Sequence, residues 1–258
     1  MSRPTPREIN REYYASDSPG RSDYWQRMAA PRSRMRTFMR TLEGRGHSSV
    51  VDLGCGSGLF LQEVKRIWPD ARLCGIDFSE HLIEANRRRE PGIEWRLADL
   101  DHGQDFSDGL AGAFDVVFAS EIVEHLDHPD ALLANAASLA RADGGFLMLS
   151  TQSGRIWETE RLVGHRRHFS AAEIGRLLES AGFIPECIWN EGFPFHGIAK
   201  WFANLAPRRA MEAFSGKPYG PMQRAICFLV RAAYTLNSRS GGAQLYALAR
   251  RGKDEGAG

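Results

Sequence analysis

The sequence predicts an α/β protein with a mostly parallel sheet that is covered by helices on both faces. Short apolar runs rich in Val, Ile and Phe alternate with longer stretches whose apolar residues recur at helical spacing. A glycine-rich turn follows the first apolar run, and acidic residues follow the next two. Strands that alternate with helices form parallel sheets, which bind ligands beyond the carboxyl ends of their strands. We therefore expect the functional residues just after strands.

Seven segments are predicted to be strands, namely residues 48–53, 71–76, 93–98, 114–119, 146–150, 184–189 and 243–249. The first is a β-branched run that ends in glycines, and the fourth is strongly apolar. Helices are expected over residues 59–68, 79–89, 129–141 and 170–181. The last of these begins with a capping box formed by Ser170 and Glu173, and Gly182 ends it.

The chain is expected to have four parts. Residues 1–46 form an Arg-rich N-terminal helical cap that Pro31 interrupts, and residues 47–192 form the ligand-binding core. Residues 193–242 depart from the strand–helix alternation, with helical stretches over 198–205 and up to 236 and with prolines, including Pro207, between them. This pattern predicts a helical insertion that acts as a lid. Residues 243–258 form the last strand and a tail.

Composition excludes several classes of protein. At 258 residues, 43% of them hydrophobic, the chain is long enough for one substantial core. Its four cysteines are scattered without a Cys-x-x-Cys pair, which disfavours a zinc site or a disulfide framework. The first 14 residues lack the apolar segment of a secretion signal, and residues 222–236 are too short and too charged to span a membrane. These features predict a cytoplasmic protein.

Charge is distributed unevenly, although the net charge is only +1. Residues 1–46 and 193–253 are strongly basic, whereas residues 47–192 are acidic. Two interpretations stay open: an ordinary solvated surface, or a basic rim that attracts an anionic substrate or makes peripheral contact with an anionic membrane. The chain has no recognisable RNA-binding module, so a nucleic-acid partner is not expected. The sequence does not indicate an oligomeric state.

The turn after the first strand carries glycines at positions 54, 56 and 58. Such glycines let backbone N–H groups approach a ligand closely, although a tight turn alone would also explain them. A dinucleotide-binding turn would have glycine at position 59, where this chain has leucine. Asp77 ends the second strand, where its carboxylate can accept hydrogen bonds from ribose hydroxyls. Asp99 ends the third strand, where it can accept one from an adenine amine.

These features resemble the class I S-adenosylmethionine-dependent methyltransferases over about residues 48–190. The resemblance implies a Rossmann-like, doubly wound sheet of seven strands whose last strand runs antiparallel, and S-adenosylmethionine as the cofactor. Arg34 is similar in position to an arginine that binds the cofactor carboxylate in the quinone-biosynthesis enzymes. The other implied cofactor-binding residues are Asp52, Gly54, Cys55 and Gly56 in the turn, Asp77 and Phe78 at the ribose, Asp99 and Leu100 at the adenine, and Ser120 and Glu121 beside the methionine moiety.

The segment after the fourth strand, residues 120–125, indicates the type of methyl acceptor. It lacks the Asn/Asp-Pro-Pro-Tyr/Phe motif of enzymes that methylate the exocyclic amines of bases, which favours oxygen over nitrogen. It is similar to the corresponding segment of the ubiquinone-biosynthesis O-methyltransferases and of the small-RNA 2′-O-methyltransferases. In those families two carboxylates and a histidine can hold a divalent metal, so Glu121, Glu124 and His125 are candidate ligands of Mg²⁺, Mn²⁺ or Zn²⁺. Without a metal, Glu124 would cap a turn and His125 would face the cofactor pocket.

Two further histidines follow the fifth strand. His165 is a candidate general base or an additional metal ligand, or else it fixes the loop onto the following helix, as is expected of His168. The catalytic candidates are therefore Glu124, His125 and His165. The expected function is O-methylation of a small-molecule, lipid-like or glycan-type acceptor hydroxyl. An RNA 2′-O-methyltransferase is the alternative, and an NAD-dependent oxidoreductase is disfavoured by the glycine spacing and by Asp99.

Overall fold

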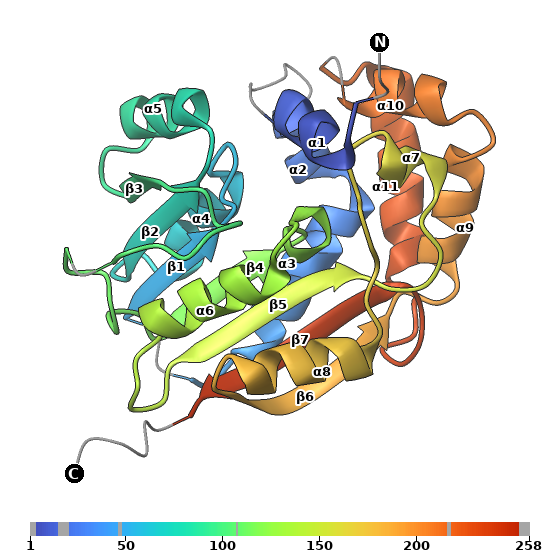
Figure 1. The fold of residues 1–258 in the computed structure, drawn as a ribbon. Helices are drawn as coiled ribbons and strands as arrows, with labels where there is room; N and C mark the ends of the chain where they lie inside the picture. The colour runs from blue at the N-terminus through green and yellow to red at the C-terminus, as the bar shows by residue number, and fades with distance from the viewer. Residues whose placement is uncertain (1–3, 15–20, 46–47, 107, 216–217, 253–258) are drawn as a thin grey trace.

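The computed structural model describes residues 4–14, 21–45, 48–106, 108–215 and 218–252, so the predicted tail at 253–258 lies outside the described residues. A seven-stranded sheet has the strand order β3-β2-β1-β4-β5-β7-β6 (Figure 1). Strands β1 to β5 pair in parallel, whereas β7 runs antiparallel to both β5 and β6. The strands are β1 (Ser49–Leu53), β2 (Arg72–Asp77), β3 (Glu94–Leu97), β4 (Val116–Ser120), β5 (Phe146–Gln152), β6 (Phe183–Glu191) and β7 (Gln244–Arg251). The predicted doubly wound sheet with an antiparallel last strand is confirmed.

Helices pack on both faces of the sheet. The core cluster on one face includes residues of α3 (Ala29–Thr41), α4 (Leu59–Ile67) and α5 (Glu80–Arg89), and the cluster on the other face includes residues of α6 (Pro129–Leu139) and α8 (Ala171–Ser180). Successive strand residues point to opposite faces, so Val50 belongs to one cluster and Val51 to the other. Ser170 and Glu173 form the predicted capping box of α8.

The remaining helices gather near the carboxyl ends of the parallel strands (Figure 1). From the N-terminal region come α1 (Pro6–Tyr14) and α2 (Arg21–Arg27), and a 3-10 turn, η1 (Val123–His125), follows β4. A short helix, α7 (Glu158–Arg161), follows β5. The segment predicted to be a helical insertion contains α9 (Phe195–Ala203), α10 (Pro207–Ser215) and α11 (Pro221–Tyr234). Among the described residues, no helix combines the length and the hydropathy that a membrane span requires.

Two prolines lie at the starts of helices. Pro31, which was expected to interrupt a helix, is in the first turn of α3, and Pro207, which was expected between helical stretches, is the first residue of α10. The first turn of a helix has no intrahelical partner for its N–H groups, so proline costs no hydrogen bond there. A further difference affects the site: β5 extends beyond residue 150 to Gln152, because it pairs with β7 as far as Gln244. This extension brings Thr151 and Gln152 to the end of the sheet where ligands are expected.

Candidate active site

A cavity of about 420 Å³ lies at the carboxyl ends of the parallel strands. Its walls come from the turns after β1, β2, β3 and β4, from the end of β5, and from residues of α1, α2, α3, α7, α9, α10 and α11. A larger hollow of about 580 Å³ lies between α3 and α4, where arginines and glutamates form much of its wall. That hollow is away from the strand ends, so the 420 Å³ cavity is the candidate active site.

The glycine turn lines this cavity and has a backbone that favours glycine. Gly54, Gly56 and Gly58 all have positive φ angles, of 74°, 52° and 71°. A Cβ atom on Gly54 would lie 2.7 Å from Ile122 Cδ1, and one on Gly58 would lie 2.5 Å from the Trp95 ring. At Gly56, by contrast, a Cβ atom would meet nothing within 4 Å. The turn is therefore fixed by close packing at its two ends and is open in the middle, where Cys55 and Gly56 line the cavity.

Asp77 ties the glycine turn to the start of α5. Its Oδ2 accepts a hydrogen bond from the Gly56 N–H at 2.8 Å, and its Oδ1 accepts one from the Ser79 N–H at 2.9 Å. Ser79 is the N-cap of α5. The carboxylate thus shapes the turn and also lines the cavity, together with Phe78, at the position predicted for the ribose.

Asp52 lies behind the turn and is not one of the residues that line the cavity. Its side chain is buried, and burial together with the nearby Asp77 charge raises its pKa well above the usual range. Burial likewise raises the pKa of the Cys55 thiol, so both groups are more easily protonated than in water. Asp52 therefore remains a candidate for organising the turn rather than a direct contact of the cavity.

The predicted adenine end of the cavity is covered by α1. Asp99 and Leu100 line the cavity there, and Asp99 forms ion pairs with Arg7 and Arg11 of α1. Arg7 also reaches Asp127, at 3.6 Å. The sequence analysis did not identify these arginines, although their i, i+4 spacing places them on one face of α1 and so is the signal that could have found them.

The two glutamates after β4 have pKa values that are shifted in opposite directions. Glu121 accepts hydrogen bonds from Gln152 Nε2 at 2.7 Å and from Gln244 Nε2 at 2.8 Å, and its carboxylate lies 3.7 Å from the Arg34 guanidinium. Burial alone would raise the pKa of Glu121, but Arg34 and the two amides lower it to about 2. Burial, and then the Glu121 charge, raise the pKa of Glu124 well above its usual value. Glu121 is therefore ionised, and Glu124 is the more readily protonated of the two.

Arg34, which the resemblance predicts to bind the cofactor carboxylate, lies in α3 at the wall of the cavity. Burial alone would lower the pKa of its guanidinium, but the Glu121 carboxylate outweighs burial and raises it. Its Nε has no hydrogen-bond partner among the described residues. A buried donor without a partner is costly, so Arg34 can offer this N–H to a ligand in the cavity. Ser120, which is also a cavity residue, shares a hydrogen bond with Ser150 at 3.1 Å.

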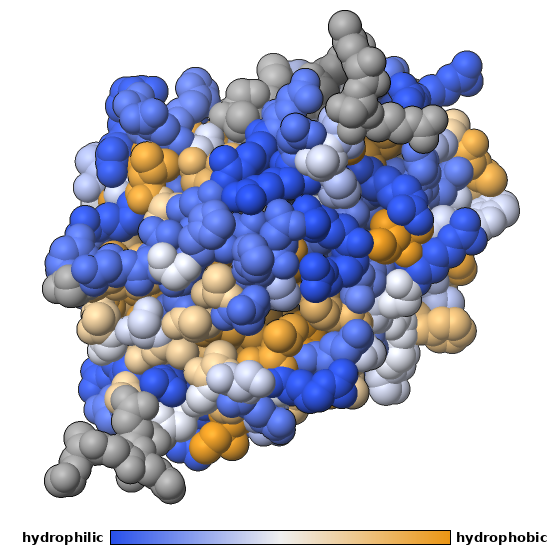
Figure 2. All heavy atoms as spheres, in the orientation of Figure 1, coloured by the Kyte–Doolittle hydropathy of each residue, from blue (hydrophilic) through white to orange (hydrophobic). Residues whose placement is uncertain are grey.

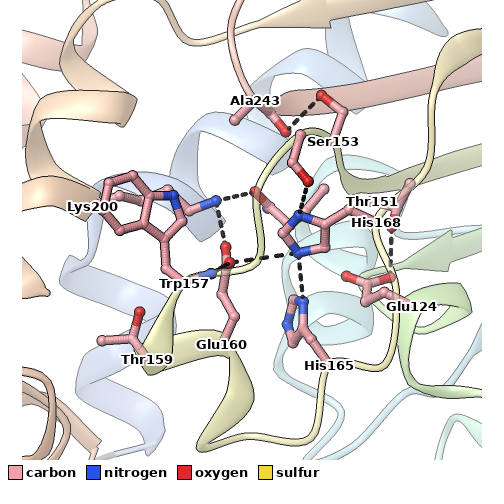
Figure 3. A network of polar contacts seen from close by, with 12 residues as sticks. Glu124, Thr151, Ser153, Trp157, Thr159, Glu160, His165, His168, Lys200 and Ala243 are labelled. Carbon is pink, nitrogen blue, oxygen red and sulfur yellow. Dashed lines mark hydrogen bonds and ion pairs between the residues drawn. The ribbon is translucent and has the colours of Figure 1, made fainter.

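A chain of polar contacts joins the histidines of the β5–α8 loop to α9 (Figure 3). His165 Nδ1 lies 3.1 Å from His168 Nε2, and His168 Nδ1 lies 3.1 Å from the Gly154 carbonyl oxygen. Glu160 connects the loop histidines to α9. Its Oε2 is 3.5 Å from His168 Nε2, and its Oε1 is 2.5 Å from Lys200 Nζ. Sequence reasoning missed Glu160 and Lys200, because they are separated by forty positions and the fold alone brings them together.

These polar contacts indicate which nitrogen of His165 is unprotonated. A carbonyl oxygen can only accept, so His168 Nδ1 donates to Gly154. In a neutral ring His168 Nε2 is then an acceptor, and His165 Nδ1 donates to it. Burial lowers the pKa of His165 to about 2, and His125 adds to this effect, so the ring is neutral at physiological pH. The neutral His165 therefore keeps Nε2 as an unprotonated base on the cavity wall.

Within the part of the chain that the structure describes, two groups of side chains have donor atoms close enough to share a cation. Glu124, His125 and His165 form one, and Glu160, His165 and His168 form the other, with the donor atoms of each group within 4.8 Å of one another. Glu121 is in neither group. Its oxygens are instead engaged by Arg34 and by amide donors. The structure thus places His165, rather than the predicted Glu121, beside Glu124 and His125. Glu124 Oε1 has no hydrogen-bond partner among the described residues, so it could serve a cation.

The far wall of the cavity is mainly apolar. It is formed by side chains of α2, α9, α10 and α11, namely Tyr24, Trp25, Ala199, Ala203, Met211, Phe214 and Tyr234. His196 of α9 is also buried there, and burial lowers its pKa to about 3. The cavity therefore has a polar end formed by strand termini and an apolar end formed by the helices around them.

The chain matches the family model described as "Methyltransferase domain" over residues 23–187. It is 29% identical over 160 residues to a malonyl-[acyl-carrier protein] O-methyltransferase of Hahella chejuensis, covering 58% of this chain and 56% of the relative. It is 33% identical over 122 residues to a ubiquinone biosynthesis O-methyltransferase of Xanthomonas axonopodis, covering 46% of this chain and 48% of the relative. The chain thus spans about half the length of these curated relatives.

Solved structures show the same fold along nearly the whole chain. The plantazolicin methyltransferase BamL, in complex with a substrate analogue and SAH, has a TM-score of 0.63 and 15% identity, covering 96% of both chains. The [4+2]-cyclase SpnF has a TM-score of 0.62 and 17% identity, covering 98% of both chains. The family match, and with it the glycine turn and the strand-end carboxylates of the cavity, identify the chain as a member of the S-adenosylmethionine-dependent methyltransferase family.

Proposed function

We propose that this chain transfers the methyl group of S-adenosylmethionine to an oxygen atom of a small, largely apolar acceptor, such as a lipid-like or glycan-type alcohol. The observation that carries the proposal is the unprotonated Nε2 of His165 on the wall of the cavity. An alcohol or phenol must lose its proton as it attacks. Burial makes the neutral His165 imidazole a weak base on its own, so His168 and the Glu160 carboxylate must stabilise the imidazolium that forms when it takes that proton. The curated relatives named above are O-methyltransferases, which supports an oxygen acceptor.

The donor would occupy the polar end of the cavity. Asp77 and Phe78 would hold its ribose, and Asp99 with Leu100 its adenine, because these residues line the cavity after β2 and β3. The unpartnered Arg34 Nε supports a role for Arg34 at the carboxylate of the methionine moiety, next to Ser120 and Glu121. The sulfonium supplies a good leaving group, so the protein mainly has to align the two reactants and exclude water.

In the proposed reaction the acceptor oxygen attacks the methyl carbon as the carbon–sulfur bond breaks, and S-adenosylhomocysteine leaves. The acceptor proton passes to His165 Nε2. The Nδ1 proton of His165 can then move toward His168 Nε2, where the Glu160 carboxylate at 3.5 Å stabilises the imidazolium. His168 and Glu160 are thus positioning residues, and general base catalysis of this kind contributes roughly 10²- to 10⁴-fold in rate.

A divalent metal at the same place is a second route to the deprotonated acceptor. Glu124, His125 and His165 would hold it, and the buried, unpartnered Glu124 Oε1 beside two imidazoles supports this donor set. A bound cation would supply Lewis-acid activation of the acceptor hydroxyl. The two routes make different demands on His165, because a nitrogen that binds a metal cannot also accept the acceptor's proton.

The test combines labelled methyl transfer with metal analysis. Purified protein is incubated with methyl-labelled S-adenosylmethionine and matched acceptors that differ only in carrying a hydroxyl or an amine on an apolar chain. Transfer to the hydroxyl series is expected, and exclusive transfer to the amines would contradict the proposal. Full turnover in excess EDTA, with no metal in the purified protein, would leave the histidine base as the route, whereas loss of turnover with restoration by Mg²⁺, Mn²⁺ or Zn²⁺ would support the metal.

A further inference from the structure

Helix α9 has one face on the cavity and an apolar face on its opposite side. His196, Ala199, Lys200 and Ala203 line the cavity, and their i, i+3, i+4, i+7 spacing defines the inner face. The other face carries Ile198, Trp201, Phe202 and, just past the helix, Leu205, with the same spacing. These four side chains are between 44% and 63% exposed. A helix that only closed the cavity would have a polar outer face, so the outer apolar face indicates a surface that contacts something outside this chain.

Helix α11, which contacts α9, also exposes apolar side chains. Met222, Ile226 and Leu229 recur along one row of the helix, and Phe228 lies on another exposed row. Met222, Phe228 and Leu229 are among the most exposed large apolar side chains of the described residues. In the space-filling view, hydrophobic side chains interspersed with hydrophilic ones reach the surface at the right-hand edge, where Figure 1 places α9 and α10 (Figure 2). We call the outer faces of α9 and α11 the α9–α11 surface.

The charge around this surface is almost entirely positive. Arg208, Arg209, Arg224, Arg231 and Arg239 are exposed, and none of them forms an ion pair with a carboxylate of the described part of the chain. Between Phe193 and Gly242 the sequence contains one acidic residue, Glu212. On α11, Arg224 and Arg231 share a helical row with Phe228, so cationic and apolar groups are adjacent. Exposed apolar side chains bordered by arginines are the pattern of helices that lie in the interface of an anionic membrane.

We propose that the α9–α11 surface docks on an anionic lipid bilayer, so that the acceptor reaches the cavity from the membrane. Helices of this length can lie in the plane of the interface but cannot cross it, in agreement with the absence of a membrane-spanning helix among the described residues. A symmetric dimer through this surface would bring two sets of arginines together, which is unfavourable. The inference rests on the proposed function, which supplies the apolar acceptor. The helices α9 and α11 would lie between the membrane and the apolar end of the cavity where that acceptor binds.

The test measures binding of the full chain to vesicles and does not depend on catalysis. The protein is co-sedimented with vesicles of phosphatidylcholine alone and of phosphatidylcholine mixed with phosphatidylglycerol, at low and high salt. Binding to the anionic vesicles is expected, with weaker binding at high salt. The double variant Phe228→Ser/Leu229→Ser and the double variant Arg224→Glu/Arg231→Glu should each bind at least about tenfold more weakly. All the substituted residues are exposed, so the fold should be preserved.

Matched controls carry the same chemical changes elsewhere. Ile67→Ser/Ile184→Ser removes two exposed apolar groups, and Arg88→Glu/Arg176→Glu makes the same change in charge, on other elements. Both controls should bind as the unaltered chain does. No binding to anionic vesicles at low salt, or equal losses in variants and controls, would overturn the proposal, as would a dimer that the Phe228→Ser/Leu229→Ser change dissociates. If the chain binds vesicles but methylates no hydroxyl acceptor, the proposed function is contradicted, whereas docking of the α9–α11 surface on the bilayer is still supported.

Discussion

The two ends of the cavity are built in different ways. At the donor end, short stretches after β1, β2 and β3 supply the candidate residues, and the Asp77 carboxylate joins the first two through hydrogen bonds to Gly56 and Ser79. At the acceptor end, side chains come from η1, from the long loop after β5 and from α9, and the His165–His168–Glu160–Lys200 chain joins them. The sheet therefore fixes the donor end, whereas tertiary contacts between distant segments assemble the acceptor end. Substitutions at the two ends should separate binding of the donor from transfer of the methyl group.

The largest effect is expected at His165. The variant His165→Gln should lower kcat by about 10²- to 10⁴-fold, because the acceptor loses its base, while the Kd for S-adenosylmethionine changes little. Labelled methyl transfer and calorimetric titration measure the two quantities. His128→Gln, at a histidine outside the cavity wall, is the control and should match the unaltered chain. A parallel loss of cofactor binding in His165→Gln would show that the two ends are not separable.

His168 offers a finer test of the same end. The variant His168→Gln leaves His165 in place but cannot accept its proton, so kcat should fall by about ten-fold or more and the KM for S-adenosylmethionine should stay near its original value. Glu160→Gln should act in the same direction and more weakly, since Glu160 reaches the ring only at 3.5 Å. If the unaltered chain, His168→Gln and Glu160→Gln were equally active across the pH range, His168 and Glu160 would not be positioning residues.

Much of the donor end could be predicted from the sequence, because its residues follow strands that the hydrophobic pattern identifies. Gly54, Gly56, Asp77 and Asp99 all line the cavity where strand order places them. The acceptor end could not be predicted in the same way. Glu160 and Lys200 become neighbours only because α9 folds back over the β5–α8 loop, and Thr151 meets Glu124 only because β5 extends to Gln152. No local pattern records such long-range contacts.

Two buried groups of the acceptor end, His196 and Glu124, should affect the pH dependence of stability in opposite directions. His196 has a pKa of about 3 when folded, so the unfolded chain binds the extra proton below pH 6.5 and stability falls as the pH drops. Glu124 has a raised pKa, so stability rises as the pH falls toward 4.5. His196→Phe should therefore make the loss of stability on acidification shallower, and Glu124→Gln should make it steeper, each by up to about 1.4 kcal/mol per pH unit. Urea unfolding between pH 7 and pH 5 measures both, and changes of the same sign would contradict these protonation states.

The smallest effect is expected where α1 covers the donor end. Arg7 and Asp99 are each about one-third exposed, so their ion pair contributes little and is screened by salt. Arg7→Gln should raise the Kd for S-adenosylmethionine by about two- to fivefold at low salt, and the difference should vanish at high salt. Arg66→Gln, which removes an ion pair with Glu63 outside this cavity, is the control. A large or salt-independent loss would mean that Arg7 contacts the cofactor itself.

We expect the strand ends of this chain to bind S-adenosylmethionine through Asp77. Calorimetric titration of the unaltered chain, Asp77→Asn and the surface control Asp130→Asn, each with S-adenosylmethionine and with NAD, measures this binding. The unaltered chain and the control should bind S-adenosylmethionine and not NAD. Asp77→Asn should bind S-adenosylmethionine about tenfold or more weakly, because hydrogen bonds to a charged group are lost. Preferential binding of NAD, or unchanged affinity for S-adenosylmethionine in Asp77→Asn with native circular dichroism, would contradict the account.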